Sequence, residues 1–144
     1  MPAANKFNDF SEQLALGKHI FDGATHTYKV ALTDTLPVNT NTVLANITQI
    51  AAGNGYTTGG TATTITESET SGTTTIQGTQ VVFTAAGGAI AQFRYYVLYN
   101  DTQTSPADAL VAWWDHGSEV NLADGESFTI KFNNASPGTI MTIA

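Results

Sequence analysis

Histidine and carboxylate side chains are the first candidates for chemistry in this chain. The three histidines, His19, His26 and His116, have neither the helical i, i+4 spacing nor the alternate strand spacing that brings two imidazoles to one metal ion. Glu67 and Glu69 share one face of a threonine-rich strand, and two facing carboxylates could serve a glycosidase as acid and base. Because nothing else in the sequence supports that reaction, a solvated strand face is the simpler interpretation.

Motifs for covalent catalysis and phosphate binding are missing from the sequence. It contains no Gly-x-Ser-x-Gly motif, no Ser-x-x-Lys motif and no cysteine, so neither an activated nucleophile nor a Cys-ligated zinc site is indicated. The glycine-rich stretches 53–60 and 87–88 lack the P-loop lysine and the dinucleotide-binding spacing, and turns explain them better. Residues 124–126 are too short for a calcium loop. The sequence therefore predicts a protein that is not an enzyme, with no catalytic residue, metal or cofactor.

Aromatic residues gather in two apolar segments and could form a platform for a carbohydrate or a peptide. Consecutive side chains on a strand point to opposite faces, so Trp113 and Trp114 cannot both line one site. We expect one tryptophan in the core and the other at a subunit interface, with a turn at Asp115-His116. Arg94, the only arginine, is expected to cover apolar surface or to pair with an acidic neighbour.

Composition narrows the class of protein further. The 144 residues favour a single domain, and the 42% of hydrophobic residues are enough for one core. Charged residues make up only 12%, whereas 24 threonines and 10 asparagines predict a hydroxyl- and amide-rich surface. A net charge of −7 leaves no basic surface for nucleic acid. No segment has the length of a membrane helix or the apolar core of a secretory signal, so we expect no membrane partner.

The first 20 residues are expected to form a helical arm. Phe7, Phe10 and Leu14 have the i, i+3, i+7 spacing of an amphipathic helix, which Gly17 would end after about three turns. An isolated helix of this length is marginal in water, so its apolar side must dock on the chain's own sheet or on a neighbouring copy.

The rest of the chain is typical of an all-β protein. We expect a central strand at 92–99, covered on both faces, and an exposed or edge strand at 61–69. Residues 73–85 read as a hairpin turning at Gln77-Gly78, and 127–132 with 139–143 as a closing antiparallel pair. Residues 38–60 form a long excursion around Tyr56. The predicted architecture is one domain over 1–144 with arm 1–20: a jelly-roll-like β-sandwich, or failing that a small closed barrel.

Several of these segments, spread over nearly the whole chain, resemble a family of small structural proteins of tailed bacteriophages. The similar stretches are Phe7 to Phe10, Glu12 to Ala15, Tyr28 to Thr33, Ile50 to Tyr56, Arg94 to Asp101, Trp113 to Asp115 and Leu122 to Glu126. The resemblance implies a capsid decoration or cement protein, made in the cytoplasm of the host bacterium and carried on the capsid surface of the virion. Its implied partners are the major capsid protein and further copies of itself, as a dimer or trimer.

Such a protein would act through surface contacts. The residues we expect to make them are Phe7, Phe10, Leu14, Tyr56, Arg94, Trp113 and Trp114. Another virion component, such as a tail protein or a receptor- or glycan-binding adhesin domain, is the alternative. An adhesin would show an exposed aromatic ring beside Asp or Asn in a groove, and a glycan hydrolase would need a cleft with two facing carboxylates.

Overall fold

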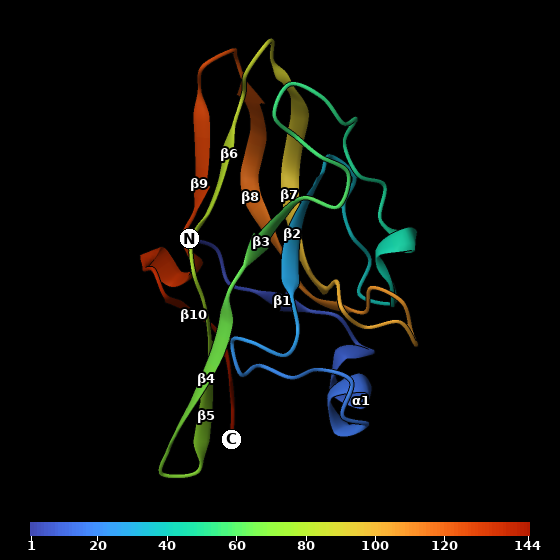
Figure 1. Ribbon diagram of the computed structural model, residues 1–144, viewed down its shortest axis with the longest axis vertical. Helices are drawn as coiled ribbons and strands as arrows, with labels where there is room; N and C mark the ends of the chain where they lie inside the picture. The colour runs from blue at the N-terminus through green and yellow to red at the C-terminus, as the bar shows by residue number, and fades with distance from the viewer.

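The computed structural model describes residues 1–144 as a mostly β protein with one short α-helix (Figure 1). Its α-helix is α1 (Phe10–Ala15), and two 3₁₀ turns are η1 (Leu44–Asn46) and η2 (Phe132–Asn134). The strands are β1 (Asn5–Lys6), β2 (Tyr28–Thr33), β3 (Thr61–Thr63), β4 (Ile65–Thr70), β5 (Thr73–Gly78), β6 (Val81–Thr84), β7 (Ile90–Asn100), β8 (Leu110–Leu122), β9 (Ser127–Ile130) and β10 (Gly138–Ile143).

The largest sheet has five strands in the order β1-β8-β7-β2-β3. Its centre is β7, which pairs antiparallel with β2 and β8 and is buried at every position from Tyr95 to Asn100. This confirms the expectation of a central strand covered on both faces. The expected turn at Asp115-His116 is wrong, because β8 runs through both residues and continues to Leu122.

The other two sheets are a three-stranded sheet, β10-β5-β4, and a two-stranded sheet, β6-β9. Both expected strand pairings are wrong. The hairpin expected over 73–85 does not form, because β5 pairs with β4 and β10 and not with β6. The pair expected between 127–132 and 139–143 does not form, because β9 pairs with β6. The tight turn lies at Ser71-Gly72, where both φ angles are positive, and not at Gln77-Gly78. The β4–β5 hairpin, with β10 beside it, extends away from the strands of the other two sheets (Figure 1). As expected, 61–69 lies at sheet edges, as β3 and β4.

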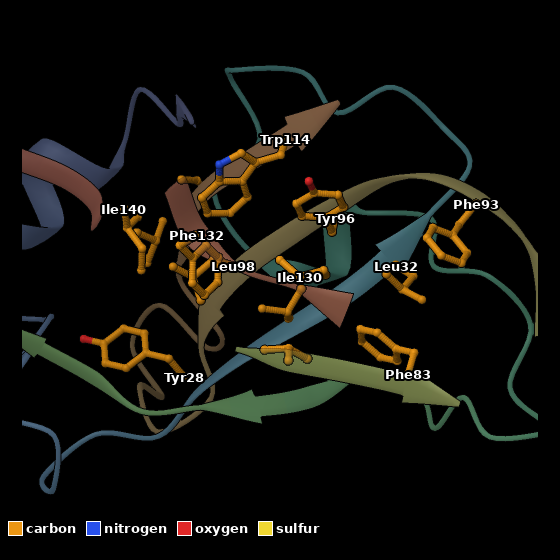
Figure 2. Close-up of a cluster of buried hydrophobic side chains, with 14 of the residues drawn as sticks. Tyr28, Leu32, Phe83, Phe93, Tyr96, Leu98, Trp114, Ile130, Phe132 and Ile140 are labelled. Atoms are coloured by element: carbon orange, nitrogen blue, oxygen red, sulfur yellow. The ribbon is translucent and has the colours of Figure 1, made fainter. Parts of the chain in front are cut away.

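The main core joins one face of the five-stranded sheet to both smaller sheets. Figure 2 shows Leu98 and Trp114 of the large sheet beside Ile130 of β9 and Ile140 of β10. Trp114 stacks on Tyr96 with ring centroids 5.7 Å apart and contacts the ring of Phe132 at 5.2 Å. Large aromatic side chains therefore hold the three sheets together.

A second apolar cluster covers the opposite face of the five-stranded sheet. Leu44 and Ile47 of the 38–60 excursion pack there against Val97 and Tyr99 of β7, and Trp113 lies at its margin. Apart from η1, residues 38–60 contain no helix or strand, as expected of an excursion. They serve as the second cover of the central strands.

The N-terminal arm docks on the chain's own sheet. The helix is shorter than the expected three turns, with six residues from Phe10 to Ala15, and Gly17 follows it with a φ of 75°. Phe7 precedes the helix and belongs to the second cluster, whereas Phe10 belongs to the main core. No helix in the structure has the length and hydropathy needed to cross a bilayer.

Candidate functional site

Four of the seven expected contact residues lie inside the chain's own core. Phe7, Phe10, Tyr56 and Trp114 are at most 2% exposed. The Tyr56 hydroxyl donates to Gln49 Oε1 at 2.7 Å and accepts a hydrogen bond from the backbone N–H of Leu32. Burial removes these four side chains from the expected interface, because a partner cannot reach them in the folded chain. Their role is to hold the arm and the excursion on the sheet.

The other three expected residues reach the surface in two places. Leu14 lines a groove between α1 and β10. Arg94 lies within β7 and Trp113 within β8, on the face of the large sheet that is turned away from the main core. One tryptophan, Trp114, lies in the core as expected, and Trp113 is half-buried at the surface; its expected place at a subunit interface stays a prediction.

The surroundings of Trp113 define a candidate contact surface, which we name the Trp113 surface. The Trp113 ring meets Tyr95 edge-on at 6.1 Å, and the Arg94 guanidinium carbon lies 5.5 Å from the centre of the Tyr95 ring. The register of the β7–β8 pair explains this grouping. Tyr95 lies directly opposite Asp115, and an irregularity in the pairing between Phe93 and Tyr95 displaces Arg94 from its regular strand position. Its residues are Leu36, Val38, Asn39, Arg94, Tyr95, Trp113 and Asp115.

An ion pair fixes the polar side of this surface. Arg94 Nε donates to Asp115 Oδ1 at 2.8 Å and its Nη2 donates to Oδ2 at 3.1 Å, a bidentate arrangement. The guanidinium holds the pKa of the Asp115 carboxyl below its usual range, and the Gly117 backbone N–H adds to the effect. Both side chains remain more than one-third exposed. The expected acidic partner of Arg94 is therefore Asp115.

The apolar side of the surface comes from residues 34–39, which are tied to the sheet at both ends. Asp34 accepts a hydrogen bond from Gln92 at 3.0 Å, and Asn39 Oδ1 accepts one from the Trp113 indole N–H at 2.9 Å. Between these anchors the side chains of Leu36 and Val38 are 57% and 56% exposed. Two large apolar side chains are thus exposed to water on a segment whose end is bonded to the half-buried Trp113.

Hollows in the surface avoid the aromatic and charged part of this group. None of the five that the structure contains is lined by Arg94, Trp113 or Asp115, and one of about 110 Å³ is lined by Leu36 and Val38. Trp113 therefore lies beside Asn39 and Asp115 but lines no groove itself. The groove expected of a glycan-binding adhesin is not found there.

A buried polar cluster around Asn100 is the feature that sequence reasoning missed. Asn100 is fully buried, its Oδ1 accepts backbone N–H bonds from Thr102 and Gln103, and its Nδ2 lies 3.3 Å from His19 Nδ1 and 2.9 Å from His26 Nδ1. The two histidines are seven residues apart, a spacing that carried no signal. No group of three or more His, Cys, Asp or Glu side chains is arranged to hold a metal ion.

The second nitrogen of His19 has no partner. Nε2 is buried without a hydrogen bond, and the ring packs between aromatic neighbours, with Phe10 at 5.1 Å and Phe21 at 6.1 Å. Burial, together with a smaller effect of the nearby His26, lowers the pKa of His19 to about 4, and Asp9 opposes the change. This cluster ties residues 18–28 to the end of β7, and its position suits a structural role.

Comparisons with protein-family models, with curated proteins and with solved structures gave no match for this chain.

Proposed function

We propose that this chain is a bacteriophage capsid decoration or cement protein. It binds the outside of the assembled head and stabilises contacts between capsomers of the major capsid protein, without catalysis. Whatever binds the assembled shell and not its dissociated subunits shifts the equilibrium towards the shell by mass action. The resemblance of the sequence to small virion proteins is the starting point of this proposal.

The observation that carries the proposal is the Trp113 surface. Tryptophan, tyrosine and arginine are the residues most enriched at the energetic centres of protein interfaces. Here they form one group, already ordered by a bidentate ion pair and an indole hydrogen bond. Ordering these side chains in advance lowers the entropy cost of binding. Exposed Leu36 and Val38 add apolar area at the rim.

The same proposal includes a finer description of the fold. We infer a jelly-roll-like β-sandwich, in which the five-stranded sheet is one layer and the two smaller sheets together form the other. The main core between them supports this description, since it takes residues from all three sheets.

Co-sedimentation with undecorated shells tests the function. Purified protein should bind such shells at a fixed ratio per capsomer and raise their melting temperature. Val38→Asp should weaken binding because it places a carboxylate on the apolar rim. Val82→Asp is the matched control, since Val82 is 42% exposed on β6, outside the Trp113 surface. Both variants should keep the wild-type circular dichroism spectrum.

One result would contradict this function, and another would contradict the role of the Trp113 surface in it. Absence of binding to shells, with density on the tail or binding to cell-surface glycan instead, would favour a tail protein or an adhesin. Equal binding by the Val38→Asp and Val82→Asp variants would show that shell binding uses another surface.

A further inference from the structure

The three-stranded sheet has two unpaired edges, β4 and β10. The middle strand β5 is bonded to both, and neither edge strand has a second partner. Because β4 and β10 both run antiparallel to β5, they run parallel to one another. Unpaired strand edges carry rows of free backbone donors and acceptors and are templates for pairing with another chain.

The edge at β10 faces the apolar groove between α1 and β10 that Leu14 lines, which we call the slot. The slot has a volume of about 560 Å³, with Met141 and Ile143 of β10 on one side and Phe10 and Leu14 of α1 on the other. Four consecutive β10 residues, 140–143, line it, so the slot runs along the strand edge. An extended strand lying in this slot would bond to the free edge of β10 and cover its apolar side chains.

The two edges differ in charge. Lys6 is the only charged residue that lines the slot; its Nζ donates to Ser11 Oγ at 3.0 Å and no carboxylate lies within ion-pair distance. The β4 edge carries exposed Glu67 and Glu69, neither paired with a cation. An unpaired lysine beside one edge and two unpaired glutamates on the other make the edges complementary.

The sheet also puts these groups on the same side. Glu67 and Met141 both lie opposite Ile76 of β5, so the two side chains share one face of the sheet. A copy rotated about an axis along the strands therefore presents β4 parallel to β10, with Glu67 on the face that Met141 occupies.

We propose that copies of this chain associate head to tail through this sheet, with β4 of one copy adding to β10 of the next and Glu67 approaching Lys6. Repeated contacts of this kind close into a ring when the rotation from copy to copy divides a full turn, and otherwise they extend as a filament; we propose the closed ring. The inference concerns contacts between copies and does not depend on shell binding.

Pairing of like edges is less favourable. Antiparallel pairing of two β4 strands around Ser68 sets Glu67 of one copy directly opposite Glu69 of the other, and like charges in that position are destabilising. Pairing of two β10 strands brings two Lys6 ammonium groups into one shared slot. In a chain with a net charge of −7, the one contact that joins opposite charges is the head-to-tail one.

Charge reversal with mass measurement tests the proposal. The wild-type protein should form one closed assembly by light scattering and native mass spectrometry. Lys6→Glu and Glu67→Lys should each weaken assembly about tenfold or more, which corresponds to about 1.4 kcal/mol. The double variant should restore it. Lys131→Glu and Glu119→Lys are matched controls, because both residues are exposed and lie outside the slot and β4.

Engineered cysteines identify the strands, and the natural chain has no cysteine to interfere. Ser68 of β4 and Thr142 of β10 share the opposite face of the sheet, since both lie opposite Thr75. A short thiol-to-thiol cross-linker should join a mixture of Ser68→Cys and Thr142→Cys variants and should not join either variant to itself.

Three outcomes would overturn the proposal. A wild-type protein that stays monomeric at high concentration has no such contact. Cross-linking of one single-cysteine variant to itself indicates pairing of like edges. Assembly unaffected by Lys6→Glu and Glu67→Lys, in variants whose circular dichroism is unchanged, places the contact between copies elsewhere.

Discussion

The buried His19 should make this protein lose stability in weak acid. In the folded chain its pKa is lowered to about 4, whereas in the unfolded chain it is 6.5. Between these two values the unfolded state binds the proton and the folded state does not, so stability is full above pH 6.5 and falls as the pH falls towards 4. At about 1.4 kcal/mol per pKa unit, the full loss is about 3 kcal/mol.

His19→Phe is the matched perturbation. Phenylalanine fills the space between Phe10 and Phe21 and removes the unpartnered buried Nε2. Asn100 Nδ2 keeps partners in the Lys18 carbonyl, at 3.1 Å, and in His26. We therefore expect a stability at pH 7.5 equal to or above that of the wild-type protein, and a smaller decrease in acid.

Urea unfolding at several pH values measures the effect. The difference in unfolding free energy between His19→Phe and wild type should grow by about 2 kcal/mol from pH 7.5 to pH 5 and level off near pH 4. NMR titration of the three histidines would follow the His19 protonation directly. A difference that stays constant with pH, or a His19 that titrates near 6.5 in the folded protein, would refute the reasoning.

Three further predictions concern single residues elsewhere. Tyr56→Phe should destabilise the fold by about 1–3 kcal/mol, because it leaves buried hydrogen-bonding groups of β2 and the excursion unpaired; urea unfolding measures this. Gly60→Ala should destabilise the fold by about 1–3 kcal/mol more than Gly17→Ala in the same assay. Both glycines have a similar positive φ, but only at Gly60 does the added Cβ fall 1.8 Å from a backbone oxygen. Equal losses of stability would mean that backbone strain at positive φ accounts for the whole effect. Arg94→Ala should leave the thermal midpoint nearly unchanged while weakening shell binding, because the exposed pair with Asp115 is screened by solvent; a large fall in the midpoint would contradict this.

Local patterns in the sequence predicted the strands with strong signals. The apolar run at 92–99 lacks simple alternation, and β7 is indeed covered on both faces, by the main core and by the excursion. The threonine- and glutamate-rich stretch 61–69 lies at sheet edges. In both cases the side chains of the segment itself carry the information, because hydrophobicity depends on whether a face is buried.

Strand partners were decided by tertiary structure. The sequence favoured a hairpin at Gln77-Gly78, but the pairing of β5 with β4 turns at Ser71-Gly72 and leaves β6 to pair with the distant β9. The Ser71-Gly72 dipeptide was the available signal for this turn. No signal in the sequence indicated the pairing of β6 with β9, since these strands lie more than 40 residues apart in the chain.

The residues of the candidate contact surface show the same difference between what local sequence predicts and what tertiary structure decides. Alternation along a strand determined that Trp113 and Trp114 face opposite ways, and the sequence alone set this result. Which of the two is buried depended on the layer that covers each face, and Trp114 lies in the main core beside Tyr96 and Phe132. The same dependence placed Phe7, Phe10 and Tyr56 in the interior and brought His19 and His26 to Asn100. A side chain's own chemistry is local, whereas its burial is decided by segments far away in the chain.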